Sequence, residues 1–324
     1  MAILAVANRT IDFDSVAGSG VVDSTLAGSF DPVFTQSSVF VGSSGAVQRN
    51  FTPSGPIIWF SYRWHRSSTT GQSGTGQGLQ IRDAAGNLLM TNEGATATSN
   101  SFFYTLYGAA NDNSLNIATS GAFTLKIDIR LDMTGPGATA EIYHNGTLVD
   151  TLTVADKGVR GNPVSFYLRP SAQVYNGWNF HHVSEVMVAD TSLLGRRLIS
   201  LNPNAVGAHS DFIGALSTLT DGDPITGLVG DAGGERHSWT LSSYTGTAGT
   251  LEAVGMNFIA HRTNGVPSQV GPFLRVGGAN YDGSLFTVGD VTWRSHLWQV
   301  NPATLAPWLS GDLASLQAGL RAAA

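Results

Sequence analysis

The chain offers few residues that could carry out catalysis. Hydrolysis of a glycosidic bond needs two carboxylates a few ångströms apart, and no glutamate here pairs with a nearby acid in a strand motif. No H-E-x-x-H, G-x-S-x-G or P-loop motif occurs in the sequence. We therefore predict no catalytic residue. If the chain does degrade glycan, Glu141 and Glu185 are the first residues to test.

Metal ligands are also not indicated. His181 and His182 are adjacent, and neighbouring side chains of a strand point to opposite faces, so the two imidazoles cannot share one ion. Asp221 and Asp223 lie in a DGDP segment that favours a turn and lacks the further ligands of a calcium loop. Cysteine is absent, which excludes disulfides, thiolate sites and a cysteine nucleophile. We expect no metal and no cofactor.

Residues suited to binding are better represented. Side chains alternate between the two faces of a strand, and four predicted strands each place one arginine on the polar face, where Trp59, His65 and Tyr167 also lie. Guanidinium groups pair with carboxylate or phosphate, and aromatic rings stack on sugar rings. The loop over 173–182 adds an aromatic candidate. The predicted glycan-binding residues are Trp59, Arg63, Arg82, Arg130, Arg169 and Trp178.

This prediction requires that the four strands share one sheet. The alternative is a solvated sheet face, or a face covered by another protein, with the arginine stems packed flat and charged pairs across the strands.

Short strands joined by turns must position these residues. Charged residues make up only 12% of the chain, and glycine occurs 39 times. Asn145-Gly146 predicts a tight hairpin over 138–154, because a type I′ turn needs positive φ at both central residues. In 123–132 the odd-numbered apolar residues share a face that must be core, opposite Thr124, Lys126, Asp128, Arg130 and Asp132. Further strands are predicted at 56–66, 78–91, 101–108, 164–170 and 181–190.

A change of composition at 191–212 predicts a boundary between two domains, which we place at 1–193 and 194–324. Strands resume at 236–244, 251–262, 271–288 and 291–300. Near the end, Asp312 is predicted to cap a helix over LASLQAG (313–319), with Gly319 as its stop.

Charge and hydropathy bear on the partners. The net charge is −6, and the only lysines are Lys126 and Lys157, which argues against nucleic acid as a partner. No apolar stretch approaches the ~18 residues of a membrane span, so we expect no membrane insertion. The start, MAILAVANRTIDFD, lacks the basic region of a signal peptide.

Several segments resemble a known class of protein. FTLKIDIRLDM (123–133), ATAEIYHNGTLVDTLTV (138–154) and HHVSEVMVADTSLLGRRLISLNP (181–203) resemble the concanavalin A-like, laminin-G-like domains of tailed-phage virion proteins. The matching strands run from Ile142 to Val149 and from Val183 to Thr191. RLISLNPNAVGAHSDF and the closing LWQVNPATLAPWLSGDLASLQAGLR are similar to the distal parts of such proteins. The calcium-binding loop residues of many laminin-G domains cannot be mapped onto this sequence.

The resemblance implies an all-β chain, with a concanavalin A-like jelly-roll sandwich followed by a second, smaller β-sandwich domain with a short C-terminal helix. It implies a non-enzymatic surface protein of a phage or gene-transfer-agent particle: a head fibre or spike, a decoration protein or part of a tail fibre. Such a protein is assembled in the bacterial cytoplasm, contacts other virion proteins and forms homo-oligomers such as trimers.

Three hypotheses follow. In the first, the lectin-like domain binds host-surface polysaccharide and the second domain attaches to the particle. In the second, the protein is a purely structural decoration or connector protein that binds only other virion proteins. The third is the glycan-degrading enzyme considered above.

Overall fold

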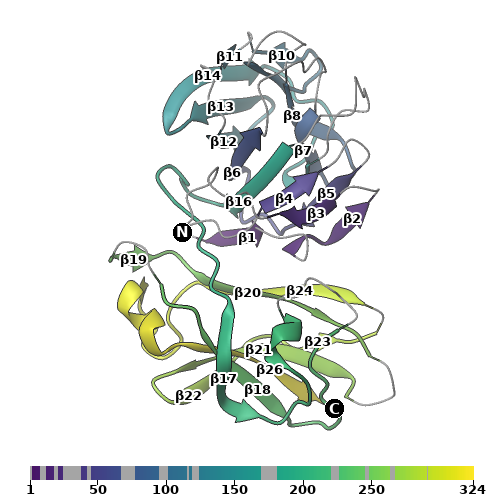
Figure 1. Ribbon diagram of the computed structural model, residues 1–324. Helices are drawn as coiled ribbons and strands as arrows, with labels where there is room; N and C mark the ends of the chain where they lie inside the picture. Colours follow the sequence, from purple (N-terminus) through teal and green to yellow (C-terminus); the bar gives the residue numbers. More distant parts are fainter. Residues whose placement is uncertain are drawn as a thin grey trace. The chain divides into compact units, whose positions relative to one another are not determined.

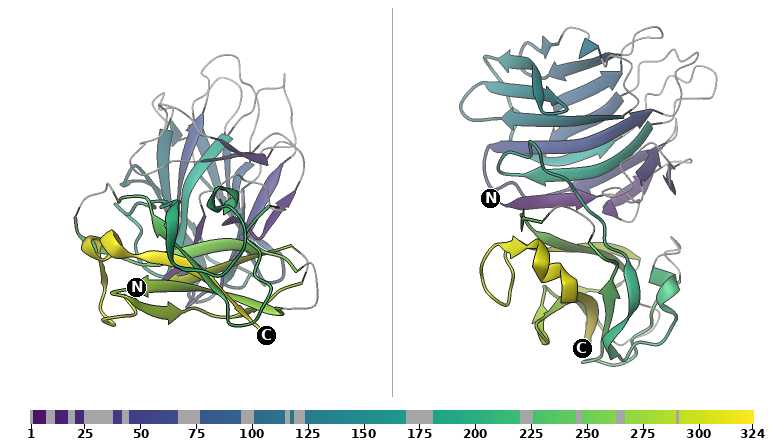
Figure 2. Two further views of the ribbon diagram at one scale, coloured as in Figure 1. Left: turned by 60° about the horizontal axis from the view of Figure 1, so that its bottom comes forward. Right: turned by 60° about the vertical axis from the view of Figure 1, so that its left-hand side comes forward.

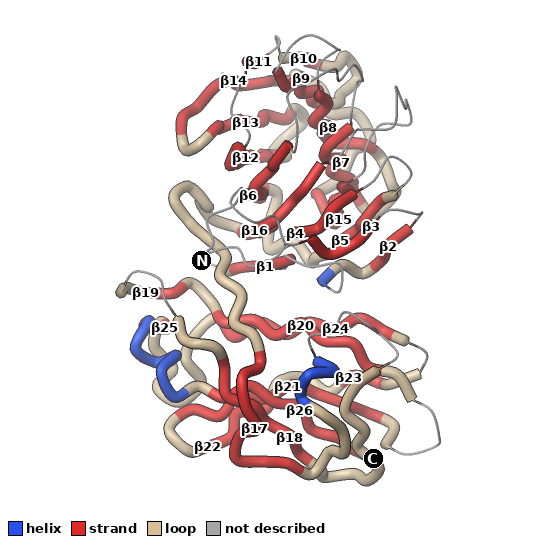
Figure 3. Tube along the Cα trace, in the orientation of Figure 1, coloured by secondary structure: helices blue, strands red, loops and turns tan. Residues whose placement is uncertain are grey.

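The structure of the chain is a computed structural model built almost entirely of antiparallel strands (Figures 1 and 3). It divides into two compact units, Met1–Ile199 and Ser200–Ala324. The structure describes residues 2–7, 12–17, 21–24, 38–41, 45–66, 77–94, 101–114, 117–118, 124–168, 181–219, 226–244, 248–262, 267–289 and 291–324.

Sheet one of the first unit has the strand order β14-β13-β12-β6-β16-β4-β3, and β1 also pairs with β16. The right-hand view of Figure 2 shows strands of this unit lying side by side. The strands are β1 (Ile3–Ala7), β3 (Val21–Ser24), β4 (Ser38–Val41), β6 (Ile57–Arg66), β12 (Thr124–Asp132), β13 (Ala138–His144), β14 (Thr147–Val154) and β16 (His181–Ala189).

Sheet two has the order β10-β9-β8-β7-β15-β5-β2, and β11 pairs with β9. Strands β7 to β10 are consecutive in sequence, whereas β7 and β15, β15 and β5, and β5 and β2 are neighbours that are not consecutive in sequence. The strands are β2 (Ser15–Ala17), β5 (Ala46–Asn50), β7 (Gln77–Asp83), β8 (Leu88–Gly94), β9 (Ser101–Leu106), β10 (Asp112–Asn113), β11 (Ile117–Ala118) and β15 (Pro163–Leu168).

The two sheets pack face to face around one core. Leu125, Ile127 and Ile129 of β12 are at most 3% exposed, as the alternation predicts. From sheet two, Ile81 and Phe166 enter the same apolar cluster. The prediction of an all-β sandwich is thereby confirmed.

The hairpin between β13 and β14 forms as predicted. Asn145 and Gly146 have φ values of 49° and 82°, which are the positive angles that a type I′ turn requires. The Asn145 side chain accepts a hydrogen bond from the backbone N–H of Lys126 (3.0 Å), so the turn is also tied to β12.

The second unit has a larger sheet in the order β17-β18-β26-β21-β22, with β23 pairing to β21, and two smaller pairs, β19-β25 and β20-β24. Its core includes Trp239, Phe258 and Trp308. The strands are β17 (Pro203–Ser210), β18 (Arg236–Leu241), β19 (Thr250–Leu251), β20 (Val254–Ala260), β21 (Gln269–Val276), β22 (Ala279–Asp282), β23 (Phe286–Thr287), β24 (Thr292–Trp298), β25 (Trp308–Leu309) and β26 (Gln317–Ala323); 3₁₀ turns span Leu216–Leu219 and Ser310–Ser315.

The C-terminal helix is shorter and earlier than predicted. A 3₁₀ helix spans Ser310–Ser315, and Asp312 lies inside it, where its carboxylate accepts from the Leu309 N–H (2.8 Å). The residues predicted to continue the helix form β26, between β18 and β21. Apolar side chains at every second position, including Ala318 and Leu320, are buried on one face, and this period of two favours a strand.

Gly319 is expected to be indispensable in β26. A Cβ at this position would lie 2.5 Å from the carbonyl oxygen of His237 and closer still to the Phe273 ring. Gly319→Ala should therefore lower the free energy of unfolding of the second unit by about 1–3 kcal/mol, as overpacking does. Gly311→Ala is the matched control, because a Cβ at Gly311 meets nothing within 4 Å. Equal losses in chemical denaturation would contradict this account.

Candidate functional site

The predicted binding residues are divided between the two sheets. Trp59 and Arg63 are on β6 and Arg130 is on β12, all on the outer face of sheet one, whereas Arg82 is on β7 of sheet two. The outer faces of a sandwich lie on opposite sides, so these arginines form no single cluster. Each strand has the predicted polar face, but alternation within a strand does not reveal which sheet the strand joins. Arg169 and Trp178 lie outside the described residues.

On sheet one, Trp59 is too buried to contact a ligand. Its side chain is 7% exposed and stacks on Tyr143, with ring centroids 5.7 Å apart. Tyr143 donates to Glu141 (2.8 Å), and Arg130 binds both Asp132 (2.9 Å) and Glu141 (3.4 Å). The polar groups of this row therefore bind one another.

Arg63 belongs to a second ion-pair cluster on sheet one. Glu185 is buried at a bulge of β16 with φ = 51°, a costly angle for a non-glycine residue. Its carboxylate receives two hydrogen bonds from Arg197 (2.6 and 2.7 Å) and pairs with Arg63 (3.2 Å). Arg197 belongs to the segment 190–199 that follows β16, so this ion pair fastens the segment to the sheet.

The same segment meets a buried pair on β12. Lys126 donates to the Leu193 carbonyl (3.0 Å) and pairs with Asp128 (3.1 Å), and both side chains are buried although they lie on the polar face. Burial raises the pKa of the Asp128 carboxyl and lowers the pKa of Lys126, while their mutual attraction opposes both shifts. This part of sheet one is thus closed by internal contacts. Glu141 and Glu185, the two catalytic candidates, are each held by arginine.

Sheet two carries a different kind of surface. Seven strands place uncharged polar side chains at matching register positions on the outer face, where each residue is the cross-strand partner of the next. We call this row the polar ladder. Its members in strand order are Asn113, Thr105, Thr91, Gln80, Tyr167, Gln48 and Ser15.

The polar ladder is open at its ends and closed in the middle. Gln80 and Thr91 are buried at 3% and 0% exposure. Gln48 and Tyr167 are half-buried, and Ser15 is exposed, on β5, β15 and β2. At the other end Asn113 of β10 is exposed next to buried Thr105, so among the described residues the end around β5 and β15 offers a ligand more members of the ladder.

Arg82 and Asn50 extend this open end. The Arg82 guanidinium lies 5.1 Å from the centroid of the Tyr167 ring and donates to Gln80 (2.7 Å) and to the Gly86 carbonyl (2.9 Å). Exposed Asn50 accepts from Gln48 (2.8 Å). The side chains are therefore held in place by one another before any ligand arrives.

This arrangement suits a ligand rich in hydroxyl groups. Amide and hydroxyl side chains both donate and accept hydrogen bonds, as sugar hydroxyls do. Tyr167 adds an amphipathic ring. The residues predicted from the sequence include Arg82, and Tyr167 is predicted only to share its polar face. Gln48 and Asn50 are not predicted, because AVQRN (46–50) is too short and mixed to indicate a strand.

Two other features are absent from the described part of the chain. No group of three or more His, Asp and Glu residues there is arranged to hold a metal ion. No helix there is long and apolar enough to cross a membrane.

Comparison with known proteins adds similar structures but no family. No family model matches the chain, and neither does any curated protein. The receptor-binding domain of botulinum neurotoxin type G is 12% identical with a TM-score of 0.41, over 61% of this chain and 48% of that one. The binding domain of Paraclostridial Mosquitocidal Protein 1 is 9% identical with a TM-score of 0.42, over 59% and 49%.

A structure of the mosaic C/D neurotoxin receptor-binding domain is 7% identical with a TM-score of 0.41, over 74% of this chain and 70% of that one. The chain spans about half the length of the first two structures. None of the three is a virion protein, and these values assign neither a family nor a function.

Proposed function

We propose that the protein is a non-enzymatic recognition protein that binds carbohydrate at the open end of the polar ladder, through Gln48, Asn50, Tyr167 and Arg82. The observation that carries this proposal is the register of the ladder, which aligns amide, hydroxyl and phenol groups on adjacent strands. Each group can exchange hydrogen bonds with a sugar hydroxyl without burying an unpaired charge.

The opposite face is a poorer candidate. On sheet one the charged groups are paired with one another, and Trp59 lies beneath Tyr143. A neutral sugar there would have to displace charge-assisted hydrogen bonds, which are about twice as strong as neutral ones. Of the two outer faces, sheet two therefore presents the groups that gain most from a glycan.

The biological setting is the second part of the proposal. The resemblance of 123–154 and 181–203 to tailed-phage domains supports a place on the surface of a phage or gene-transfer-agent particle, where the first unit contacts host polysaccharide. The second unit then attaches the protein to the particle or to sister copies.

A purely structural role is the alternative, and the second unit provides an observation in its favour. Among the residues that the structure describes, eight of the ten exposed large apolar residues are in that unit, and exposed apolar groups favour protein contact. Two of them, Ile213 and Val229, are hydrogen-bonded to each other through their backbones (2.8 Å). A protein that co-assembles with capsid or tail proteins and binds no carbohydrate would support this alternative.

The test of the proposed site compares the two sheet faces. Tyr167→Ala and Gln48→Ala are each expected to weaken binding to extracted host-type polysaccharide about tenfold, the effect of losing roughly 1–1.5 kcal/mol of hydrogen bonding. Binding is measured with purified protein on intact cells and on polysaccharide, at low and high salt.

Tyr143→Ala is the matched control, since Tyr143 is the half-buried tyrosine on the outer face of sheet one. It should bind as the parent protein does. Loss of binding in Tyr143→Ala, with Tyr167→Ala unaffected, would move the site to sheet one. Circular dichroism verifies that each variant is folded.

A further inference from the structure

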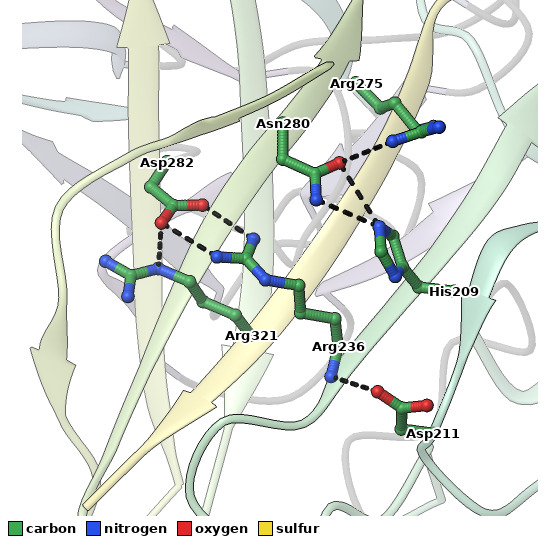
Figure 4. Close-up of polar contacts among 7 residues, drawn as sticks. All are labelled: His209, Asp211, Arg236, Arg275, Asn280, Asp282 and Arg321. Atoms are coloured by element: carbon green, nitrogen blue, oxygen red, sulfur yellow. Dashed lines mark hydrogen bonds and ion pairs between the residues drawn. The ribbon is translucent and has the colours of Figure 1, made fainter. Parts of the chain in front are cut away.

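The larger sheet of the second unit has a polar face on which arginine is concentrated. Residues 200–324 contain five arginines and no lysine against nine aspartates and glutamates. Three of the arginines, Arg236, Arg275 and Arg321, lie together on this face, with the carboxylate of Asp282 between two of them and Asp211 at the end of β18 (Figure 4). An acidic unit thus carries a local excess of positive charge.

A buried aromatic ring forms the base of this face. Phe273 is fully buried, although it lies on the polar side of β21. Gly319 on the neighbouring strand leaves room for the ring. The His209 ring meets it edge-on at 5.7 Å between centroids, and the Arg236 guanidinium lies over it at 4.9 Å. The polar groups above Phe273 therefore rest on a rigid support.

Asp282 forms ion pairs with two of the three arginines. Arg236 binds both of its oxygens (2.7 and 2.9 Å), and the Nε of Arg321 approaches one of them (3.3 Å), as Figure 4 shows. The side-chain hydrogen bonds from Arg236 lower the pKa of the Asp282 carboxyl. Asp211 accepts from the backbone N–H of Arg236 (3.0 Å), at the end of the strand. This clamp joins β18, β26 and β22.

Arg275 stands apart from the clamp. Its guanidinium donates to the side-chain oxygen Oδ1 of Asn280 (3.2 Å), and within the described residues it has no carboxylate partner. The Asn280 amide nitrogen donates to an unprotonated His209 Nε2 (3.0 Å), or its oxygen accepts from a protonated one (3.2 Å). Figure 4 shows the Arg275 guanidinium on the far side of Asn280 from Asp282.

We propose that Arg275, Asn280 and His209 bind an anionic group, the carboxylate or sulfate of an acidic saccharide. A guanidinium offers its donors in a planar fork that matches such a group. Asn280 fixes the orientation of Arg275, and the neighbouring carboxylate, Asp282, is bound by Arg236 and Arg321. The saccharide source rests on the proposed function and extends it to a second site with a different, acidic specificity.

The experiment titrates the full-length protein with polygalacturonate, dextran sulfate, neutral dextran and inorganic sulfate at low and high salt. Arg275→Gln is expected to weaken binding of polygalacturonate or dextran sulfate about tenfold at low salt, in line with the loss of hydrogen bonds to a charged group. Asn280→Ala should also weaken it, although this variant changes no charge.

Arg262→Gln is the control, because Arg262 is exposed in the same unit and lies outside the cluster. The affinity of this variant for the acidic polymers should be within about twofold of the parent's, because a single exposed charge contributes little. Equal losses in Arg275→Gln and Arg262→Gln, unchanged binding in Asn280→Ala, or no binding of either acidic polymer would overturn the proposal. Binding of inorganic sulfate alone would also overturn the saccharide ligand. Tyr167→Ala should leave binding of the acidic polymers intact. A failure of this proposal can therefore be distinguished from a failure of the binding site proposed at the polar ladder.

Discussion

Glu185→Ala is expected to lower the free energy of unfolding of the first unit by about 3 kcal/mol. Removing one member of a buried ion pair typically costs 3–5 kcal/mol, because the remaining charge is left without compensation. Here two guanidinium groups lose the carboxylate they share. The side chains of Arg63 and Arg197 are 17% and 22% exposed, so water partly solvates the two charges after Glu185 is removed. We therefore expect a loss at the lower end of the range of about 3–5 kcal/mol.

Glu141→Ala provides the comparison for this prediction. Glu141 is also a strand glutamate paired with arginine, but its side chain is 30% exposed. Its removal should cost about 1 kcal/mol or less, as for surface pairs. Urea denaturation of both variants measures the difference, and equal costs would be inconsistent with a buried pair. A double variant lacking Glu185 and Arg197 should recover part of the loss, because one of the uncompensated cations is removed with the anion.

Strand β12 shows where sequence patterns are informative and where they are not. The period of two in β12 correctly places Leu125, Ile127 and Ile129 in the core, because it depends only on the geometry of a single strand. The same pattern assigns Lys126 and Asp128 to the polar face, which is correct, but both are buried. Their burial depends on a segment some 65 residues away, through the contact of Lys126 with Leu193.

The binding surface that we propose could be predicted only in part from the sequence, for a related reason. Arg82 is among the predicted residues and Tyr167 shares its predicted polar face, but their neighbours Gln48 and Asn50 lie on a strand of five residues with no distinct pattern. Strand order decides which side chains meet, and sheet two joins β7, β15 and β5, which are far apart in sequence. The four arginines looked equivalent in the sequence, yet Arg82 lies on a different sheet from Arg63 and Arg130.

The second large effect is a loss of stability of the first unit as the pH falls. His144 is 8% exposed in the core of the first unit, and its Nε2 lies 2.7 Å from the Tyr104 hydroxyl oxygen. Burial lowers the pKa of His144 from 6.5 to about 4. The unfolded chain therefore takes up a proton below pH 6.5 while the folded chain does not, and the free energy of unfolding falls as the pH drops from 6.5 to 4. At about 1.4 kcal/mol per pKa unit, the loss is roughly 3 kcal/mol.

His144→Gln tests this assignment, because glutamine keeps a hydrogen-bonding group for Tyr104 but does not titrate. Chemical denaturation across the interval from pH 6.5 to 4 should show a loss of stability that is about 3 kcal/mol smaller in the variant than in the parent. Asp83 and Asp132 contribute little in this window, since their pKa values are lowered from 3.8 and their effect begins only below it. The raised pKa of Asp128 acts in the opposite direction within the window and is common to both proteins. Parallel stability curves for parent and variant would mean that the imidazole is protonated inside the fold, and the buried Tyr104–His144 contact would then need a different description.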